Sequence, residues 1–186
     1  IEAVPEGRYV TLLHRASWMR NASLSENVTK CESVTIVRVC RGQLGAAWEI
    51  GQPVLLREGL HVYNSPTFKF EAMLDVNETY ICHGSIHILR VKRGKYALVW
   101  EGGHGAAVPK ILPEGLHVAD SPFFRFEKVV DVNTPSIVHG TLTVLRVQKG
   151  FVAKVFEDQL PYLLGEGLHW RTSASFEFRG TQALTD

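Results

Sequence analysis

The chain has 186 residues, of which 45% are hydrophobic and 21% are charged, and its formal net charge is +1. This composition is typical of a globular protein and excludes a disordered chain, a collagen and a basic protein that coats nucleic acid. A chain of this length forms one or two domains and can bury a core without disulfide bonds.

The start of the chain and its apolar runs bear on targeting. The sequence begins at Ile1 without a basic stretch followed by an apolar run, so we expect a processed chain or a fragment. No run of 18 apolar residues occurs, which excludes a membrane-spanning helix within these residues. A membrane anchor in segments outside them stays open.

Internal repetition is the main feature of the sequence. A block of 13 residues that starts at Gly59 returns at Gly115 with nine identical positions, and a more divergent copy starts at Gly167. A second block precedes each of these, starting at Val37, Leu89 and Leu145. The two blocks recur with spacings of 52 and 56 residues in opposite order, so four residues are inserted in the middle copy. We place this insertion at 102–105, because glycine-rich hairpin ends tolerate additions.

The repeats divide the chain into four parts. Residues 1–32 are interpreted as a degenerate copy or cap, since Val4–Val10 is similar to Val91–Ala97 but the later blocks are missing. Three copies of about 52–56 residues follow, at 33–84, 85–140 and 141–186, the last including a C-terminal tail.

Each copy shows a period of two, which predicts strands and not helices. In the middle copy, the segment 85–91 is the first predicted strand, and Gly94 supplies a turn after which 96–100 returns as a second strand. A short third strand, such as 53–56, precedes a Glu-Gly turn. We expect about four or five strands per copy and an all-β fold of tandem units.

The last segment of each copy alternates aromatic and charged residues. In Phe68-Lys69-Phe70-Glu71 and its equivalents at 124–127 and 176–179, we expect two rings to point into the core and two charges to point outward. Burial of two phenylalanines contributes about 3–6 kcal/mol per copy before the entropy cost is subtracted.

Five of the eight histidines recur in register. His61, His117 and His169 follow Gly-Leu, while His83 and His139 precede a glycine at a copy boundary. Because equivalent positions lie one repeat apart, they are poorly suited to one metal ion, and we expect these rings to hydrogen-bond turns. One metal-site hypothesis merits a test. In it, the Gly-Leu-His histidine of one copy pairs with the His-Gly histidine of the next copy.

No motif for nucleophilic, phosphate-binding or metalloprotease chemistry is present, and Gly103-His104-Gly105 lacks the third glycine of a dinucleotide-binding fingerprint. The repeated Glu58, Glu114 and Glu166 are interpreted as turn formers. Features that recur three times usually serve the fold, so we predict no enzyme and no catalytic, cofactor-binding or metal-ligating residues.

The balanced charge also argues against nucleic-acid binding. The repeated arginines are instead expected to pair with repeated glutamates on the adjacent strand. The three predicted pairs are Arg38 with Glu49, Arg90 with Glu101 and Arg146 with Glu157.

Cysteines and glycosylation triplets point to different compartments. Cys31, Cys40 and Cys82 fit three free thiols in a reducing compartment. The triplets that begin at Asn21, Asn27 and Asn77 matter only if the chain is secreted. We expect an intracellular protein, either cytoplasmic or peripheral to a membrane, with secretion as the alternative.

The run 91–122 resembles the start of the stomatin, prohibitin and flotillin head domain, known as the SPFH or Band 7 domain. The resemblance rests on Val4-Pro5-Glu6-Gly7 and on Pro113-Glu114-Gly115 with His117, and it is weaker at Arg57-Glu58-Gly59 and at Gly165-Glu166-Gly167, where the proline is lost. A weaker resemblance links the repeats to those of the major vault protein. The long coiled coil and the membrane-inserting segment usual in the family are absent from these residues.

The resemblance implies assembly into larger oligomers. The function expected from the sequence is therefore a non-enzymatic scaffold that assembles with other protein subunits, as a homo-oligomer or within a larger complex. Two alternatives remain: a membrane-associated regulator of a partner protein, and a secreted β-repeat binding module.

Overall fold

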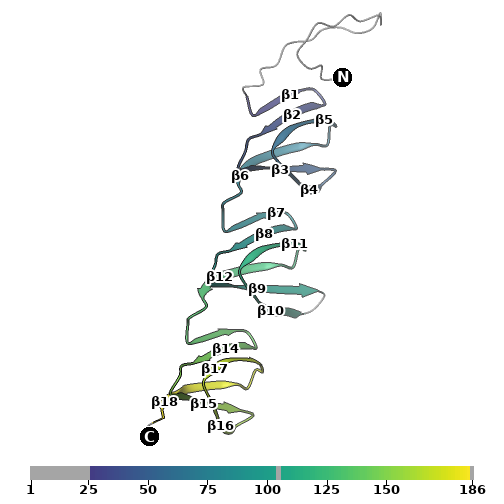
Figure 1. Cartoon of the computed structure of the whole chain (residues 1–186). Coiled ribbons are helices and arrows are strands. Elements are labelled where there is room, and N and C mark those ends of the chain that lie inside the picture. Colours follow the sequence, from purple (N-terminus) through teal and green to yellow (C-terminus); the bar gives the residue numbers. More distant parts are fainter. Residues whose placement is uncertain (1–25, 104–105, 185–186) are drawn as a thin grey trace, which may run out of the picture. The chain divides into compact units, whose positions relative to one another are not determined.

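The computed structural model describes residues 26–103 and 106–184, which form 18 strands and no helix (Figure 1). The predicted N-terminal copy falls mostly outside the described residues. The strands of copy 1 are β1 Val28–Cys31, β2 Val34–Val39, β3 Gln43–Glu49, β4 Gln52–Leu56, β5 Gly59–Asn64 and β6 Lys69–Asp75. Those that follow are β7 Tyr80–His83, β8 Ile86–Val91, β9 Lys95–Gly103, β10 Ala106–Leu112, β11 Gly115–Asp120 and β12 Arg125–Asp131. The last six are β13 Ser136–His139, β14 Leu142–Val147, β15 Phe151–Glu157, β16 Leu160–Leu164, β17 Gly167–Thr172 and β18 Glu177–Ala183.

The all-β prediction is confirmed, with six strands per copy where four or five were expected. The difference is the four-residue strand that opens each set of six, β1, β7 or β13, which is too short to show a period. The strands form six antiparallel sheets of three strands. The chain divides into two compact bodies, body 1 at 1–84 and body 2 at 85–186.

Each copy is built from two sheets that face one another. In copy 1 the sheets have the orders β1-β2-β5 and β4-β3-β6, and in copy 3 they have the orders β13-β14-β17 and β16-β15-β18. In copy 2, β8 pairs with β11, and a second sheet has the order β10-β9-β12. The sheet of copy 3 begins at Ser136, whereas the division by sequence starts that copy at residue 141.

The glycine turn after the first long strand does not close a paired hairpin, contrary to the interpretation from sequence. Gly42, Gly94 and Gly150 adopt φ values of 82°, 75° and 81°, as predicted for this turn. The strands that it joins belong to different sheets, as with β14 and β15. The turn therefore carries the chain from one sheet to the other, and the long strands pair with segments further along the chain.

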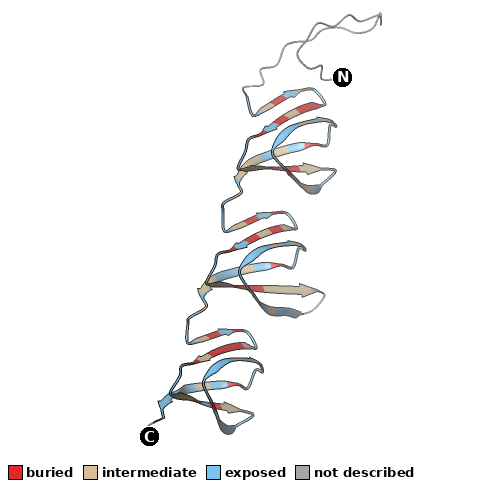
Figure 2. Cartoon of the chain, in the orientation of Figure 1, coloured by how far each residue is buried: buried red, intermediate tan, exposed pale blue. Residues whose placement is uncertain are grey.

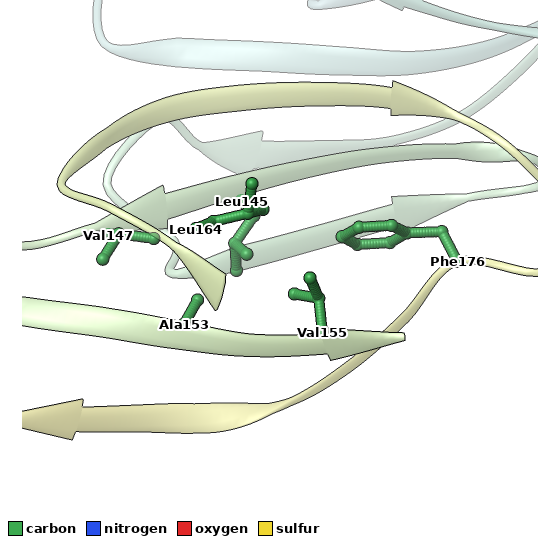
Figure 3. Packing of buried hydrophobic residues seen from close by; sticks show 6 residues of the cluster. All are labelled: Leu145, Val147, Ala153, Val155, Leu164 and Phe176. Atoms are coloured by element: carbon green, nitrogen blue, oxygen red, sulfur yellow. The ribbon is translucent and has the colours of Figure 1, made fainter. Parts of the chain in front are cut away.

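The core lies between the two sheets of each copy. In copy 3, Leu145 and Val147 of the first sheet meet Ala153 and Val155 of the second, with Phe176 closing one side (Figure 3). Figure 2 shows buried residues concentrated on the central strands. The same arrangement recurs in copy 1, where the buried cluster is Val37, Val39, Ala47, Leu56 and Phe68.

The aromatic pairs of the last segment are partly as predicted. The first ring of each pair is buried, with exposed fractions of 2% for Phe68, 7% for Phe124 and 8% for Phe176. The second ring is half-buried and packs at the margin of the core, as Phe70 and Phe178 do. Each copy thus keeps one buried phenylalanine at an equivalent place.

The four-residue insertion of copy 2 lies in the β9–β10 hairpin, as predicted. Strands β9 and β10 have nine and seven residues, against seven and five in the equivalent hairpin of β15 and β16. Gly103 pairs with Ala106 at the tip, and residues 104 and 105 lie outside the described part of the chain. The insertion lengthens the hairpin and leaves the two sheets unchanged.

Candidate functional site

The histidines of the Gly-Leu-His turns hold the backbone, as the sequence predicted. In His61, His117 and His169, Nε2 lies 2.7, 2.8 and 2.8 Å from the carbonyl oxygen of the residue four positions earlier. Because a carbonyl only accepts hydrogen bonds, Nε2 carries the hydrogen in all three rings. Each ring satisfies a turn carbonyl that lies between two strands, near a glycine with φ between 132° and 138°.

The histidines that precede a glycine belong to a second, more elaborate arrangement. In body 1, His83 is 4% exposed, and its Nε2 donates to the carbonyl oxygen of Ala47 at 2.7 Å. Its Nδ1 lies 3.4 Å from Glu71 Oε2, and the same oxygen accepts a hydrogen bond from Trp48 Nε1 at 2.7 Å. The Trp48 and His83 rings lie 4.7 Å apart between centroids.

Body 2 repeats this arrangement with nearly the same distances. His139 Nε2 donates to the carbonyl oxygen of Val99 at 2.7 Å, and Nδ1 lies 3.4 Å from Glu127 Oε2. Trp100 Nε1 donates to that oxygen at 2.8 Å, and the two rings are 4.5 Å apart. We call each set of three residues a Trp–Glu–His cluster.

The cluster in body 2 joins two copies. His139 lies on β13 in the first sheet of copy 3, whereas Val99 and Trp100 lie on β9 in the second sheet of copy 2. Gly140 follows with φ of 58°, and a Cβ on it would meet the Trp100 ring at 2.8 Å and Pro109 at 3.0 Å. The cluster therefore fixes the start of one copy against the preceding copy.

Apolar packing completes this junction. Leu98 of β9 is buried together with Ile137 of β13 and Val144 of β14, and Tyr96, Ile111 and Val130 of copy 2 pack against them. Tyr96 also meets Trp170 of copy 3 edge to face, with centroids 5.9 Å apart. Four apolar side chains of copy 2 thus cover the outer face of the first sheet of copy 3.

The glutamate of each Trp–Glu–His cluster lies at a β-bulge. In β6 and β12 the pairing with the central strand skips one residue, which is Glu71 in β6 and Glu127 in β12. A bulge re-aims the side chain of the extra residue. Both glutamates are exposed, so these charges point outward as predicted, and each carboxylate also accepts an indole hydrogen bond that the sequence did not predict.

Copy 3 lacks the cluster. Phe156 stands where copies 1 and 2 have tryptophan, and Arg179 stands at the bulged position of the glutamate. Arg179 lies 5.7 Å from the centroid of the Phe156 ring, which is a cation–π distance. Because tryptophan and glutamate change together, their joint presence in two copies was a signal in the sequence that they interact.

We expect Trp100→Phe to raise the pKa of Glu127. The hydrogen bond from Trp100 is the largest influence that holds this pKa below its ordinary value of 4.5, with the charges of His139, Lys128 and Arg125 acting in the same direction. A lowered pKa stabilises the fold above pH 4.5, and the stabilisation is lost as pH falls through the folded-state pKa.

The measurement is an NMR titration of the Glu127 carboxyl carbon in both proteins. The variant should also lose more stability at pH 7 than at pH 3. An unchanged titration curve would show that the indole does not stabilise the carboxylate.

The other residues singled out from the sequence fall as follows. Glu58, Glu114 and Glu166 are exposed and precede the positive-φ glycines of the turns, as predicted. The expected arginine–glutamate pairs do not lie on adjacent strands, because β2 and β3 are in different sheets, as are β14 and β15. Glu49 accepts from Ser65, Glu101 pairs with Lys110 and Glu157 accepts from Tyr162, while Arg146 donates to the Val132 carbonyl.

Within residues 26–103 and 106–184, no group of three or more His, Cys, Asp and Glu side chains is placed to hold a metal ion. His117 and His139 bond to different backbone carbonyls, so the pairing between the two histidine types is not formed in body 2. In the same part of the chain, no helix is long and apolar enough to cross a membrane.

These features define the class of the protein: an all-β tandem-repeat protein whose repeated polar groups hold turns and the junction between copies 2 and 3. The chain is similar to two vacuolins of Dictyostelium discoideum, Vacuolin-A with 39% identity and Vacuolin-B with 37% identity, each over 70 residues. The match covers 36% of this chain and 12% of each vacuolin. No family model and no solved structure matches the chain.

Proposed function

We propose that the protein is a non-enzymatic scaffold that assembles with other protein subunits, as a homo-oligomer or as part of a larger complex. The observation that carries the proposal is the recurrence of the same hydrogen bonds in successive copies. In the three turn histidines and the two Trp–Glu–His clusters, the polar groups form hydrogen bonds to the backbone or to one another. Such groups serve the shape of a repeat array, and repeat arrays offer extended binding surfaces.

The strand edges supply the surface for assembly. Val108 on β10 and Val138 on β13 are 52% and 64% exposed, and both strands lie at an edge of their sheet. An edge strand presents backbone groups that can pair with another chain, and exposed apolar side chains add to the contact. The resemblance of the turn motifs to SPFH domains supports an assembling protein.

Size-exclusion chromatography with light scattering tests the proposal on the full chain, whose monomer mass is 20.8 kDa. We expect a multiple of this mass at micromolar concentration and a smaller mass for Val138→Lys. Leu184→Lys is the matched control, because Leu184 is equally exposed at 64% but lies beyond the end of β18. A strict monomer across this concentration range argues against self-assembly.

A second candidate is a regulator at a membrane surface, placed inside the cell and peripheral to the bilayer. It is favoured by the similarity to SPFH heads together with the two vacuolins. Co-sedimentation with phosphatidylcholine vesicles, with and without phosphatidylserine, tests it. Binding to vesicles by the wild-type chain supports this candidate, and no binding to either kind leaves the scaffold as the better proposal.

The third candidate is a secreted binding module. Asn27 and Asn77 are exposed, and Asn77 lies in a turn in which its backbone N–H bonds to Asp75. Asn21 lies outside the described residues. Peptide mapping for glycans at these three asparagines distinguishes this candidate, because only a secreted chain would carry them.

A further inference from the structure

We infer that the outer face of the sheet β16-β15-β18 is a stop face, which means that no further β unit packs on it. Lys154 is the residue that prevents this packing. The inference deepens the proposed function, because it states through which surface the scaffold does not assemble. The residues that form the junction between copies 2 and 3 differ among the three copies.

At that junction, the second sheet of copy 2 contributes Tyr96, Leu98, Ile111 and Val130. The equivalent residues of copy 1 are all apolar as well: Leu44, Ala46, Leu55 and Leu74. In copy 3 they are Val152, Lys154, Leu163 and Gln182. Lysine and glutamine thus replace two of the four residues, and Lys154 stands where the fully buried Leu98 stands in copy 2.

The strand registers confirm that these positions are equivalent. Leu98 lies opposite Ile111 in the pairing of β9 with β10, and Lys154 lies opposite Leu163 in the pairing of β15 with β16. Tyr96 lies opposite Val130, and Val152 lies opposite Gln182. All four positions therefore share one face of the second sheet.

The position that Lys154 occupies in copy 3 is buried at the junction of copies 2 and 3. Ala97, Leu98 and Val99 are all buried, so β9 is covered on both faces. In β15, Ala153 and Val155 are buried but Lys154 between them is exposed, so only the face toward the core of copy 3 is covered (Figure 2). Leu163 is 63% exposed on the same outer face.

The polar part of the junction is missing from this face too. A following unit would find Phe156 and Arg179 where the Trp–Glu–His cluster needs an indole and a carboxylate. An arginine there would face the incoming histidine with a like charge at low pH and offers no acceptor at any pH. Covering Lys154 would also bury an unpaired ammonium group, which is costly. Repeat arrays commonly end in a unit with a polar outer face.

Two measurements on the full chain test the inference. The first uses the double variant Leu98→Lys, Val130→Gln, which places the lysine and glutamine of copy 3 at the equivalent positions of copy 2, inside the existing junction. We expect limited proteolysis within 132–135, between β12 and β13, to become about tenfold faster than in the wild-type chain, because copies 2 and 3 no longer hold together. Lys69→Gln, an exposed change on β6, is the control and should leave the cleavage rate unchanged. An unchanged rate in the double variant would overturn the inference, since these positions would then not decide stacking.

The second measurement is amine labelling of Lys154 with mass spectrometry over a range of protein concentrations. We expect Lys154 to be labelled as fast as Lys92, an exposed turn residue, whether the chain is monomeric or assembled. Protection of Lys154 in the assembled state, with Lys92 still labelled, would show that a subunit covers this face and would contradict the inference. A chain that stays monomeric defeats the proposed self-assembly, while the proteolysis result still decides the stop face.

Discussion

Gly140→Ala should lower the melting temperature by about 4–20 °C, which corresponds to about 2–5 kcal/mol in a chain of this size. Two costs add at this position. The φ of 58° is left-handed, and an alanine there costs about 1–2 kcal/mol. A Cβ would also meet the Trp100 ring at 2.8 Å and Pro109 at 3.0 Å, and relieving such overlap costs about 1–3 kcal/mol.

Gly94→Ala is the matched control for this prediction. Its φ of 75° carries a similar backbone cost, but a Cβ there meets nothing within 4 Å. We therefore expect the smaller loss of about 1–2 kcal/mol. Differential scanning calorimetry of the three proteins makes the comparison, and equal losses in both variants would mean that close packing against Trp100 does not stabilise the junction.

Leu145→Ala is the second change with a large expected effect. Leu145 is 1% exposed and belongs to the cluster that joins the two sheets of copy 3 (Figure 3). Removal of a fully buried leucine side chain leaves a cavity and costs about 2–5 kcal/mol. Leu160→Ala is the control, because Leu160 is 70% exposed and its loss should change stability by less than about 0.5 kcal/mol.

Urea unfolding followed by fluorescence and circular dichroism measures both leucine variants. The chain has two compact bodies, so the transition assigned to body 2 is the one to compare. If Leu145→Ala unfolds at the wild-type urea concentration, the two sheets of copy 3 are not held together by this cluster.

Much of the fold follows from residues whose local preference and position agree. Gly94 and Gly150 need positive φ, and Phe124 and Phe176 need burial, so turns and core could be placed from the sequence alone. The histidine after Gly-Leu could be assigned to a turn because its register excluded a shared ion. These features depend on local chemistry that each copy repeats.

What sequence reasoning missed depends on pairing across the chain. The sequence around Gly94 predicts a hairpin, but β8 and β9 lie in different sheets. Strand β8 pairs with β11, and β9 pairs with β12. For the same reason, the predicted pair of Arg146 and Glu157 does not lie on adjacent strands, because β14 and β15 belong to different sheets. Each residue has another partner instead.

The Trp–Glu–His cluster was hidden by two features. Its glutamate is exposed and so follows the pattern of an ordinary outward-facing charge. His139 lies on a four-residue strand that shows no period, so only its place beside Gly140 marked it in the sequence. The change of tryptophan to Phe156 together with that of glutamate to Arg179 in copy 3 was the one available clue.

Native-state hydrogen exchange tests the central claim most directly, namely that one two-sheet module occurs three times and that its repeated groups hold its shape. We predict three strongly protected windows at 34–49, 86–103 and 142–157, which contain the central strands of the six sheets, with faster exchange in the edge strands β4, β10 and β16. Protection confined to one of these windows, or strongest in the edge strands, would contradict the claim.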